Sequence, residues 1–375
     1  MKTNDIITND MKKNRAGSFL LFSGIFAAAG LLLAAAIVAA ADPFFRYHDP
    51  LPGFPYVIDN QLSQNIGMAE RFSYDGVITG SSMTMNFDTQ DFTELFADHP
   101  QVLKLTMNGA LPGDIGRMLE AVYGGRSAAE GEIREIFIAI DPAAWTAEEG
   151  SVKYPYPEYL YDRNPFNDVK YLLNMEVLLE YCVKPAAERE GTPLNRVYMT
   201  EWEDDLYYTL DWILSHYDEP AAAPEQTPAD AYLADTVRNM ETYILPYVRA
   251  HPETEWYFFF PPYSLFYWHD AVRGDHLEAT LAQEAAITEL LLKEENVRVF
   301  QYQDREEIIT DLDGGYMDEV HFRPEVNAYM AADMAADGGR IRDAADMERH
   351  LTHLRTIIES REPELAERIR SYKTE

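Results

Sequence analysis

The sequence predicts an α/β domain whose parallel sheet lies between layers of helices, with one apolar helix ahead of it. The first observation is a series of five short apolar runs stopped by turn residues, which is typical of strands buried on both faces. The second observation is that helical patterns fill the intervals between these runs. The runs cover residues 77–79, 102–107, 133–140, 256–260 and 297–302.

Two of the helical intervals have a clear apolar face. Apolar residues at helical spacing precede the fourth run, and a second set precedes the fifth. They are Leu233, Val237, Met240, Ile244 and Val248, followed by Leu277, Leu281, Ala285 and Leu292. Such alternation predicts right-handed β-α-β crossovers and a three-layer arrangement. Sheets of this kind bind their ligands at the carboxyl ends of the strands, so a site is expected there.

The composition supports a large folded domain and excludes nucleic-acid binding. The chain has 375 residues, of which 47% are hydrophobic and 13% aromatic, enough for an extensive core. Lys and Arg total 31 against 64 Asp and Glu, which gives a net charge of −33. A surface this acidic repels polyanions, which proteins hold with clustered Lys and Arg. The single cysteine, Cys182, excludes an internal disulfide and any multi-cysteine metal site.

Residues 18–41 form an uncharged apolar run that is long enough to cross a bilayer. The residues before it include Lys12, Lys13 and Arg15, whereas the chain after it is acidic. Because the basic flank of such a segment stays in the cytoplasm, we expect a single-pass anchor in the cell membrane, with the large C-terminal part outside. A cleaved signal peptide is the alternative, since residues 39–41 resemble an A-x-A site. The apolar segment of such peptides is usually shorter, about 7–15 residues.

We expect four parts along the chain. A cytoplasmic tail and the anchor are followed by a stalk or collar rich in Pro, Gly and aromatic residues, and then by the α/β domain. A mostly helical insertion interrupts that domain between its third and fourth strands. It contains clustered tyrosines that could either pack together or stack on a sugar or acyl chain. The parts are residues 1–17, 18–41, 42–71 and 72–375, with the insertion at about 143–228.

A pair of serines follows the first predicted strand, where sheets of this kind bind ligands. Residues 80–84 read Gly-Ser-Ser-Met-Thr, and Asp88 is placed to cap the next helix. Backbone N–H groups at the start of that helix would then lie near the serines. Taken alone, the pattern also fits an ordinary turn.

A candidate acid–base pair lies near the other end of the chain. Of the nine histidines, only His321 has a carboxylate three residues earlier, at Asp318. In a loop, this spacing lets the carboxylate accept a hydrogen bond from one imidazole nitrogen while the other nitrogen faces a nucleophile. A serine nucleophile requires that arrangement. A surface loop that contains the same spacing by chance is the alternative.

Together, the two patterns resemble the GDSL/SGNH hydrolases. Residues 80–84 are similar to the first block of that family, G-D-S-L, with Ser in place of Asp. Asp318 and His321 are similar to its terminal D-x-x-H block. The resemblance implies a flavodoxin-like fold, with Ser82 as nucleophile, His321 as general base and Asp318 as the acid that orients it. It also implies an oxyanion-hole donor at Gly109, after the second strand, beside the backbone N–H of Ser82.

One block of the family pattern is missing. The third block has an asparagine after the fourth strand that donates to the oxyanion, but residues 261–264 read Pro-Pro-Tyr-Ser here. Loss of one such donor costs roughly 10²–10³ in rate. Activity therefore requires a substitute, for which Asn108, Tyr263 and Ser264 are the candidates. This departure, the double-serine first block and the single N-terminal anchor together resemble membrane-anchored members of the family that transfer D-alanine in teichoic-acid modification, and SGNH-like proteins that acetylate exported polysaccharides.

These observations predict a membrane-anchored serine esterase or O-acyltransferase that acts outside the cytoplasm. The expected substrate is an acylated cell-envelope glycan or a small acyl ester, with a membrane acyl-donor protein as a candidate partner. A catalytically silent SGNH-like binding or scaffold protein of an envelope assembly is the alternative. No H-E-x-x-H, Walker A or G-x-G-x-x-G pattern is present, and the predicted chemistry needs no metal and no cofactor.

Overall fold

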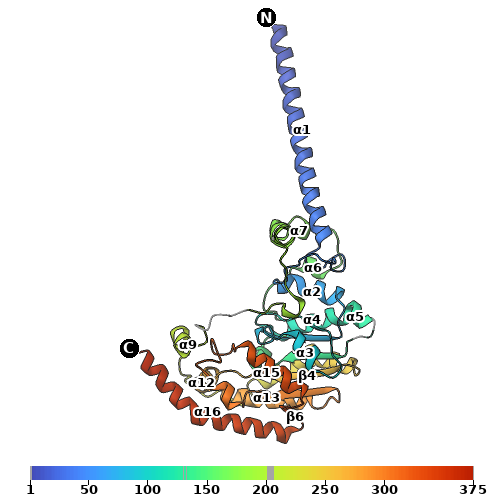
Figure 1. Ribbon diagram of the computed structural model, residues 1–375. Helices are drawn as coiled ribbons and strands as arrows, with labels where there is room; N and C mark the ends of the chain where they lie inside the picture. The colour runs from blue at the N-terminus through green and yellow to red at the C-terminus, as the bar shows by residue number, and fades with distance from the viewer. Residues whose placement is uncertain (1, 130, 132, 201–206, 375) are drawn as a thin grey trace. The chain divides into compact units, whose positions relative to one another are not determined.

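The computed structural model describes residues 2–129, 131, 133–200 and 207–374. This part of the chain has an α/β fold built on one six-stranded sheet with flanking helices (Figure 1). The order β2-β1-β3-β4-β5-β6 begins with the 2-1-3-4-5 order of flavodoxin-like folds. The strands are β1 (Gly76–Thr79), β2 (Val102–Lys104), β3 (Glu135–Ala139), β4 (Glu255–Phe260), β5 (Val297–Gln301) and β6 (Arg340–Ile341).

The five predicted strands are present and pair in parallel. β3 and β4 lie at the centre, and helices on both faces bury nearly every residue in them. This burial explains their continuous apolar sequences. The aromatic rings of Phe92, Phe137 and Tyr257 form part of the core. The ring of Phe137 has its centroid 4.7 Å from that of Phe92 and 4.6 Å from that of Tyr257.

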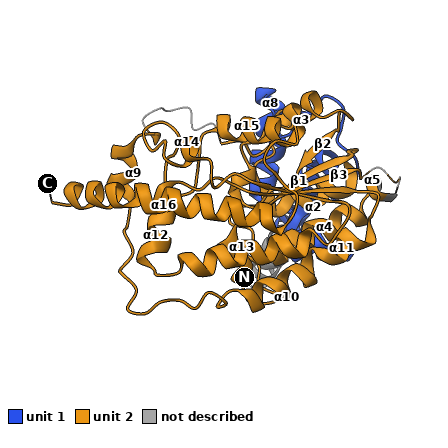
Figure 2. Cartoon of the chain, turned by 90° about the horizontal axis from the view of Figure 1, so that it is seen from below, with its two compact units in different colours: residues 1–57, 157–192 blue, residues 58–156, 193–375 orange. Residues whose placement is uncertain are grey.

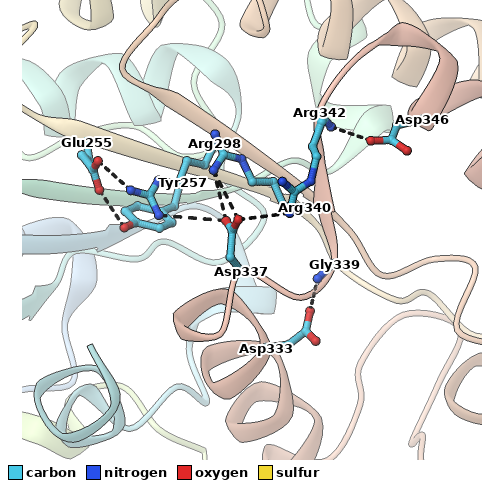
Figure 3. Close-up of polar contacts among 9 residues, drawn as sticks. All are labelled: Glu255, Tyr257, Arg298, Asp333, Asp337, Gly339, Arg340, Arg342 and Asp346. Carbon is cyan, nitrogen blue, oxygen red and sulfur yellow. Dashed lines mark hydrogen bonds and ion pairs between the residues drawn. The ribbon is translucent and has the colours of Figure 1, made fainter. Parts of the chain in front are cut away.

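The sixth strand was not predicted and makes the sheet mixed, because β6 runs antiparallel to β5. Two residues are too few to give a sequence signal. Polar contacts at this edge supplement the short pairing (Figure 3). Arg340 and Arg298 both lie within ion-pair distance of Asp337, at 3.2 and 4.0 Å, and the amide of Gly339 donates to Asp333. Such partly exposed ion pairs add little to the stability of the fold, so their main effect is to orient β6 beside β5.

The described chain divides into two compact units, which are coloured separately in Figure 2. Unit 1 comprises residues 1–57 and 157–192, and unit 2 comprises residues 58–156 and 193–375. Unit 1 contains the helices α1 (Lys2–Ala41), α6 (Glu158–Tyr161), α7 (Val169–Leu172) and α8 (Lys184–Glu188) and the π-helix η3 (Val177–Val183).

Unit 2 contains the sheet and the remaining helices. Its short 3₁₀ helices are η1 (Ser82–Thr84), η2 (Pro142–Thr146) and η4 (Leu194–Arg196). Its α-helices are α2 (Gln61–Arg71), α3 (Thr89–Leu95), α4 (Pro112–Gly124), α5 (Arg126–Ala129), α9 (Leu210–His216), α10 (Leu233–Tyr243), α11 (Leu245–Ala250), α12 (Leu265–Arg273), α13 (Leu277–Leu291), α14 (Glu306–Ile309), α15 (Pro324–Ala335) and α16 (Ala344–Tyr372).

Helices cover both faces of the sheet in unit 2. α3 and α15 pack together on one side, while α4, α10 and α13 form a continuous layer on the other (Figure 2). α16 packs against α12 and α13. This three-layer arrangement leaves the carboxyl ends of the parallel strands as the edge from which the candidate site is built.

Two segments differ in detail from what their composition suggested. The segment expected to be a collar ends in α2, which packs against α4. The region expected to be a mostly helical insertion contains short helices separated by irregular stretches, and residues 201–206 within it lie outside the described residues. Of the insertion's tyrosines, Tyr156 is buried, and its hydroxyl donates to Asp114 at 2.8 Å.

One helical segment among the described residues, Ser18–Ala41 of α1, is long and apolar enough to cross a membrane. Most of it is exposed, which distinguishes it from the core helix of a globular protein.

Candidate functional site

The turn after β1 has a backbone that only glycine accommodates. Gly80 has φ of +140°, and a Cβ there would lie 3.2 Å from the Cβ of Ala139 and 3.3 Å from its backbone nitrogen. The chain then enters η1, which Ser81 caps by accepting a hydrogen bond from the amide of Met83 at 3.2 Å. Ser82 is the first residue of η1 and is partly exposed. The Gly-Ser-Ser sequence therefore builds a tight turn that presents Ser82 at the edge of the sheet.

Neighbouring elements hold this turn in place. The carbonyl of Ser81 accepts hydrogen bonds from the hydroxyls of Thr84 and Thr106, at 2.8 and 2.7 Å. The side chain of Asn327, on α15, donates to the carbonyl of Met83 at 3.0 Å. The three donating side chains, those of Thr84, Thr106 and Asn327, are buried. Satisfied hydrogen bonds therefore fix the turn in addition to packing.

Ser82, His321 and Asp318 form a continuous chain of hydrogen bonds. The Oγ of Ser82 lies 2.8 Å from Nε2 of His321, and Nδ1 of His321 lies 2.6 Å from Oδ2 of Asp318. Since a carboxylate only accepts, Nδ1 carries the proton and Nε2 is left to accept from the serine hydroxyl. The other oxygen of Asp318 accepts from the amides of Val320 and His321, at 2.9 and 2.6 Å. The loop thus fixes the carboxylate, which in turn fixes the imidazole.

The electrostatics of the pair favour a protonatable imidazole beside an ionised carboxylate. Burial by itself would lower the pKa of His321, but its hydrogen bond to Asp318 and the charge of that residue raise it above the usual value. Burial would likewise raise the pKa of Asp318, yet its contacts with His321 lower it overall. An imidazole with a raised pKa accepts a proton from a hydroxyl more readily.

Asp141, two residues beyond the end of β3, is a site residue that the sequence analysis did not identify. Its carboxylate accepts a hydrogen bond from the hydroxyl of Tyr263, and the hydroxyl of Ser81 also bonds to it. Desolvation raises the pKa of Asp141, against these hydrogen bonds and the charge of His321. In the sequence, an aspartate followed by a proline signalled only the end of a strand. Its position after a central parallel strand was the signal that could have found it.

Two of the predicted oxyanion donors are engaged elsewhere. The hydroxyl of Tyr263 donates to Asp141, and the Oγ of Ser264 donates to the carbonyl of Glu319 at 2.8 Å. The amide of Ser264 donates to the same carbonyl at 3.1 Å. Ser264 therefore ties the end of β4 to the loop that carries Asp318 and His321.

The turn after β2 retains the other candidate donors. The backbone amide of Met107 donates a hydrogen bond to the carbonyl of Gly80 at 3.0 Å, which brings this segment beside the serine turn. Gly109 has φ of +63°. Asn108 is exposed, and its backbone amide donates to the side-chain oxygen of Gln61 at 2.8 Å. No acceptor within the described residues pairs with the backbone amide of Gly109, the side chain of Asn108 or the amide of Ser82. These three groups are the donors that remain for an oxyanion.

Lys104, at the end of β2, is fully buried and was also not identified from the sequence. Its Nζ donates to the carbonyl of Met85, the residue that follows η1, at 2.7 Å. Burial lowers the pKa of Lys104 to about 7, and the charge of Asp88 acts in the opposite direction. The lysine therefore braces the backbone just after Ser82, at the cost of burying a titratable group.

Comparisons with known proteins add little to this geometry. No model of a known protein family matches the chain, and no curated protein matches it. Among solved structures, the chain is similar to one from Streptococcus pneumoniae that is described provisionally as a platelet activating factor. The identity is 13% and the TM-score 0.37, over 74% of this chain and 89% of that chain. Similarity at this level carries no argument about activity. Within the described residues, no group of three His, Cys, Asp or Glu side chains could hold a metal ion.

Lys104→Met should change how stability depends on pH. Lys104 loses its proton near pH 7 in the folded chain but near about 10.4 when unfolded. Between these values the unfolded chain binds more protons, so the wild-type free energy of unfolding rises with pH, by up to about 1.4 kcal/mol per unit. From pH 7 to pH 9 it should rise by roughly 2–3 kcal/mol more in the wild type than in Lys104→Met. Urea unfolding of the full chain in detergent measures this difference, and parallel pH dependences would contradict it.

Proposed function

We propose that this protein is a membrane-anchored serine esterase or O-acyltransferase of the SGNH type. The observation that carries the proposal is the unbroken hydrogen-bonded chain from Ser82 through His321 to Asp318. An acid, a base and a hydroxyl in this order are what acyl transfer through a serine requires. The turn that presents Ser82 at the carboxyl edge of a flavodoxin-like sheet supports the same assignment.

The first half of the reaction forms an acyl-enzyme. The Oγ of Ser82 attacks the carbonyl carbon of an acyl ester while Nε2 of His321 takes the hydroxyl proton. Asp318 stabilises the imidazolium that results. When the tetrahedral intermediate collapses, the bond to the leaving alkoxide breaks, and the imidazolium returns its proton to that oxygen. The products are an alcohol and an ester on Ser82.

The second half repeats these steps with a different nucleophile. Water gives hydrolysis, and a sugar hydroxyl gives transfer. In both cases Nε2 of His321 takes the proton of the attacking oxygen and then gives it back to Ser82 as the acyl–serine bond breaks. The amides of Ser82 and Gly109, with the side chain of Asn108, are the donors that we assign to the oxyanion. Acylated envelope glycans are the substrate class that we propose, since the anchor would hold the site outside the cytoplasm.

A catalytically silent binding protein is the second candidate. It is favoured by the absence of the third-block asparagine together with the engagement of Tyr263 and Ser264, whose hydroxyls donate to other groups. A site with weak oxyanion stabilisation could bind an acylated glycan without turning it over. The two candidates differ in whether Ser82 is nucleophilic.

Retention of the apolar helix as an anchor is supported by the residues around Ala41. The carbonyl of Ala41 accepts a hydrogen bond from the hydroxyl of Tyr56 at 3.0 Å. Asp42 is fully buried, and its carboxylate accepts from the amides of residues 46–48 and from the hydroxyl of Tyr171. Since the junction at the A-x-A sequence belongs to a folded unit, we propose an uncleaved anchor over a removed signal peptide.

Ser82→Ala should abolish covalent labelling by a fluorophosphonate probe, whereas Ser81→Ala should retain most of it. The hydroxyl of Ser82 faces His321, while that of Ser81 is occupied by Asp141 and the amide of Met83. Gel fluorescence of the labelled full chain measures both effects. The adjacent serine serves as the matched control, and equal labelling of wild type and Ser82→Ala would support the silent binding protein.

Asp318→Asn should lower the rate of ester hydrolysis by a factor on the order of 10⁴. It should also move the acid limb of the pH profile. The base must be neutral to act, and the raised pKa of His321 places the wild-type midpoint above about 6.5, the ordinary value for histidine. Without the hydrogen bond and charge of Asp318, that pKa falls, so the midpoint of kcat/KM moves to lower pH.

Asp313→Asn is the matched control for this profile. Asp313 lies in the same loop, but its carboxylate accepts from the amide of Leu210 and not from the imidazole. The control should keep the wild-type midpoint. A midpoint that is unchanged in Asp318→Asn would contradict the coupling of Asp318 to the base that titrates.

The large C-terminal part should be accessible to protease added to intact cells and should fractionate with the membrane. The basic residues before Ser18 predict that the N-terminus remains in the cytoplasm. Immunoblotting with an antibody to the C-terminus, before and after permeabilisation, measures this topology. A fragment that is protected until permeabilisation would reverse the orientation, and a soluble product starting near Asp42 would mean that the helix is a cleaved signal.

A further inference from the structure

Unit 1 has a group of exposed apolar side chains close to each other in sequence. We call this group the apolar ledge. It extends from just before α7 to the end of η3, and its most exposed member, Phe166, has 90% of its surface accessible. The ledge consists of Phe166, Val169, Leu173, Met175, Leu179 and Val183. Such a concentration of exposed apolar side chains marks a surface that something apolar covers.

The spacing of the ledge residues is that of an amphipathic surface. Met175, Leu179 and Val183 follow one another at intervals of four, so they form a row along η3 and the helical residues just before it. Beside this row runs a charged one, in which Lys184 pairs with Glu180 at 3.1 Å. The opposite face of the same segments is buried in unit 1 through Tyr171, Val177, Tyr181 and Cys182. The ledge is therefore the outer apolar side of helices whose inner side already has its packing partners.

That inner side packs against the end of the apolar helix. Both α7 and η3 contact α1, and α7 lies beside the lower end of α1 in Figure 1. The ring of Phe44, just after α1, stacks on Tyr171 with centroids 5.3 Å apart and meets Tyr181 edge-on at 5.1 Å. On α1 itself, Ala34 and Ala35 are partly buried, and Val38 and Ala41 are buried, whereas the residues on the other side of these turns stay exposed. The ledge is thus fixed to the last two turns of the apolar segment.

The length of the apolar segment sets the depth of the ledge. Its 24 residues span about 36 Å as a helix, whereas the hydrocarbon core of a bilayer is about 30 Å thick and the interfacial regions add roughly 5–7 Å on each side. The turns from Ala34 to Ala41 occupy about the last 12 Å, so they straddle the boundary between hydrocarbon and headgroups. Helices packed on those turns lie at the same depth.

We propose that the apolar ledge inserts into the interfacial layer of the bilayer and gives unit 1 a second attachment beside α1. The helices that carry the ledge contact the end of α1 within one compact unit, so lipid around that end of α1 would also lie against the ledge. Amphipathic segments bind lipid in this way, with the apolar face buried about 5–10 Å into the boundary. Two attachments hold unit 1 in one orientation, which a single helix free to rotate cannot do. The inference requires α1 to span the membrane but does not depend on the chemistry at Ser82.

Site-specific fluorescence of the full chain in lipid vesicles tests the proposal. Cys182 is the only cysteine and is buried, so a Cys182→Ala background gives a chain without a thiol. An environment-sensitive NBD label is then attached at Phe166→Cys, Met175→Cys or Leu179→Cys, in vesicles of phosphatidylcholine and phosphatidylglycerol. Each label should show blue-shifted emission and strong quenching by lipids that carry a nitroxide high on the acyl chain. Far-ultraviolet circular dichroism checks that each variant is folded.

Two further labels make the outcome decisive. Glu190→Cys lies in unit 1 on an exposed, charged stretch and should remain water-exposed and weakly quenched. Leu32→Cys, on the exposed middle of the apolar helix, should be quenched deep in the bilayer and so reports whether α1 is inserted. Quenching at Leu32 together with ledge labels that match Glu190 would overturn the proposal. Ledge labels that are water-exposed in vesicles but shielded in native membranes would also overturn it, because the ledge would then bind a protein.

Discussion

The hydrogen bond between Ser82 and His321 is the interaction on which the rest of this account depends. It joins two residues 239 positions apart in the sequence, and it forms only because the parallel sheet brings the ends of its strands to one edge. β1 leads into the serine turn, and the loop between α14 and α15, beyond β5, carries the histidine. Ser264, after β4, holds that loop through two hydrogen bonds to the carbonyl of Glu319. The central apolar strands therefore contribute to the site indirectly, because they position the strand ends and loops that carry its residues.

The site is built largely from buried polar groups, which stabilise less than apolar packing of equal volume and cost more when they are left unpaired. Lys104 braces the end of η1 from a position where burial lowers its pKa to about 7. Asp141, whose charge interacts with that of His321, has a pKa that desolvation raises. A chain selected for stability alone would place apolar residues at both positions. The presence of Lys104 and Asp141 is typical of a functional site, in which the orientation of Ser82 and the charge near His321 are kept although they lower the stability of the fold.

Much of the fold followed from the sequence, because continuous apolar runs bounded by turns identify buried parallel strands. β6 did not follow, since two antiparallel residues leave no periodic signal. Asp318 and His321 were identifiable because their spacing is local, and the structure has a hydrogen bond between them and another between His321 and Ser82. Lys104 and Asp141 could not be found in this way, because their importance lies in what surrounds them after folding. For the same reason, the sequence could not tell that the hydroxyls of Tyr263 and Ser264 already have acceptors.

The most direct test of the central claim is to trap the acyl-enzyme. The full chain is mixed rapidly with p-nitrophenyl acetate, quenched in acid, digested and analysed by peptide mass spectrometry. We expect a burst of nitrophenolate and an acetyl group on the peptide that contains Ser82, with fragmentation placing the acetyl group on that serine. Acetylation of Ser81 or of another residue, or turnover with no burst and no adduct on Ser82, would contradict it.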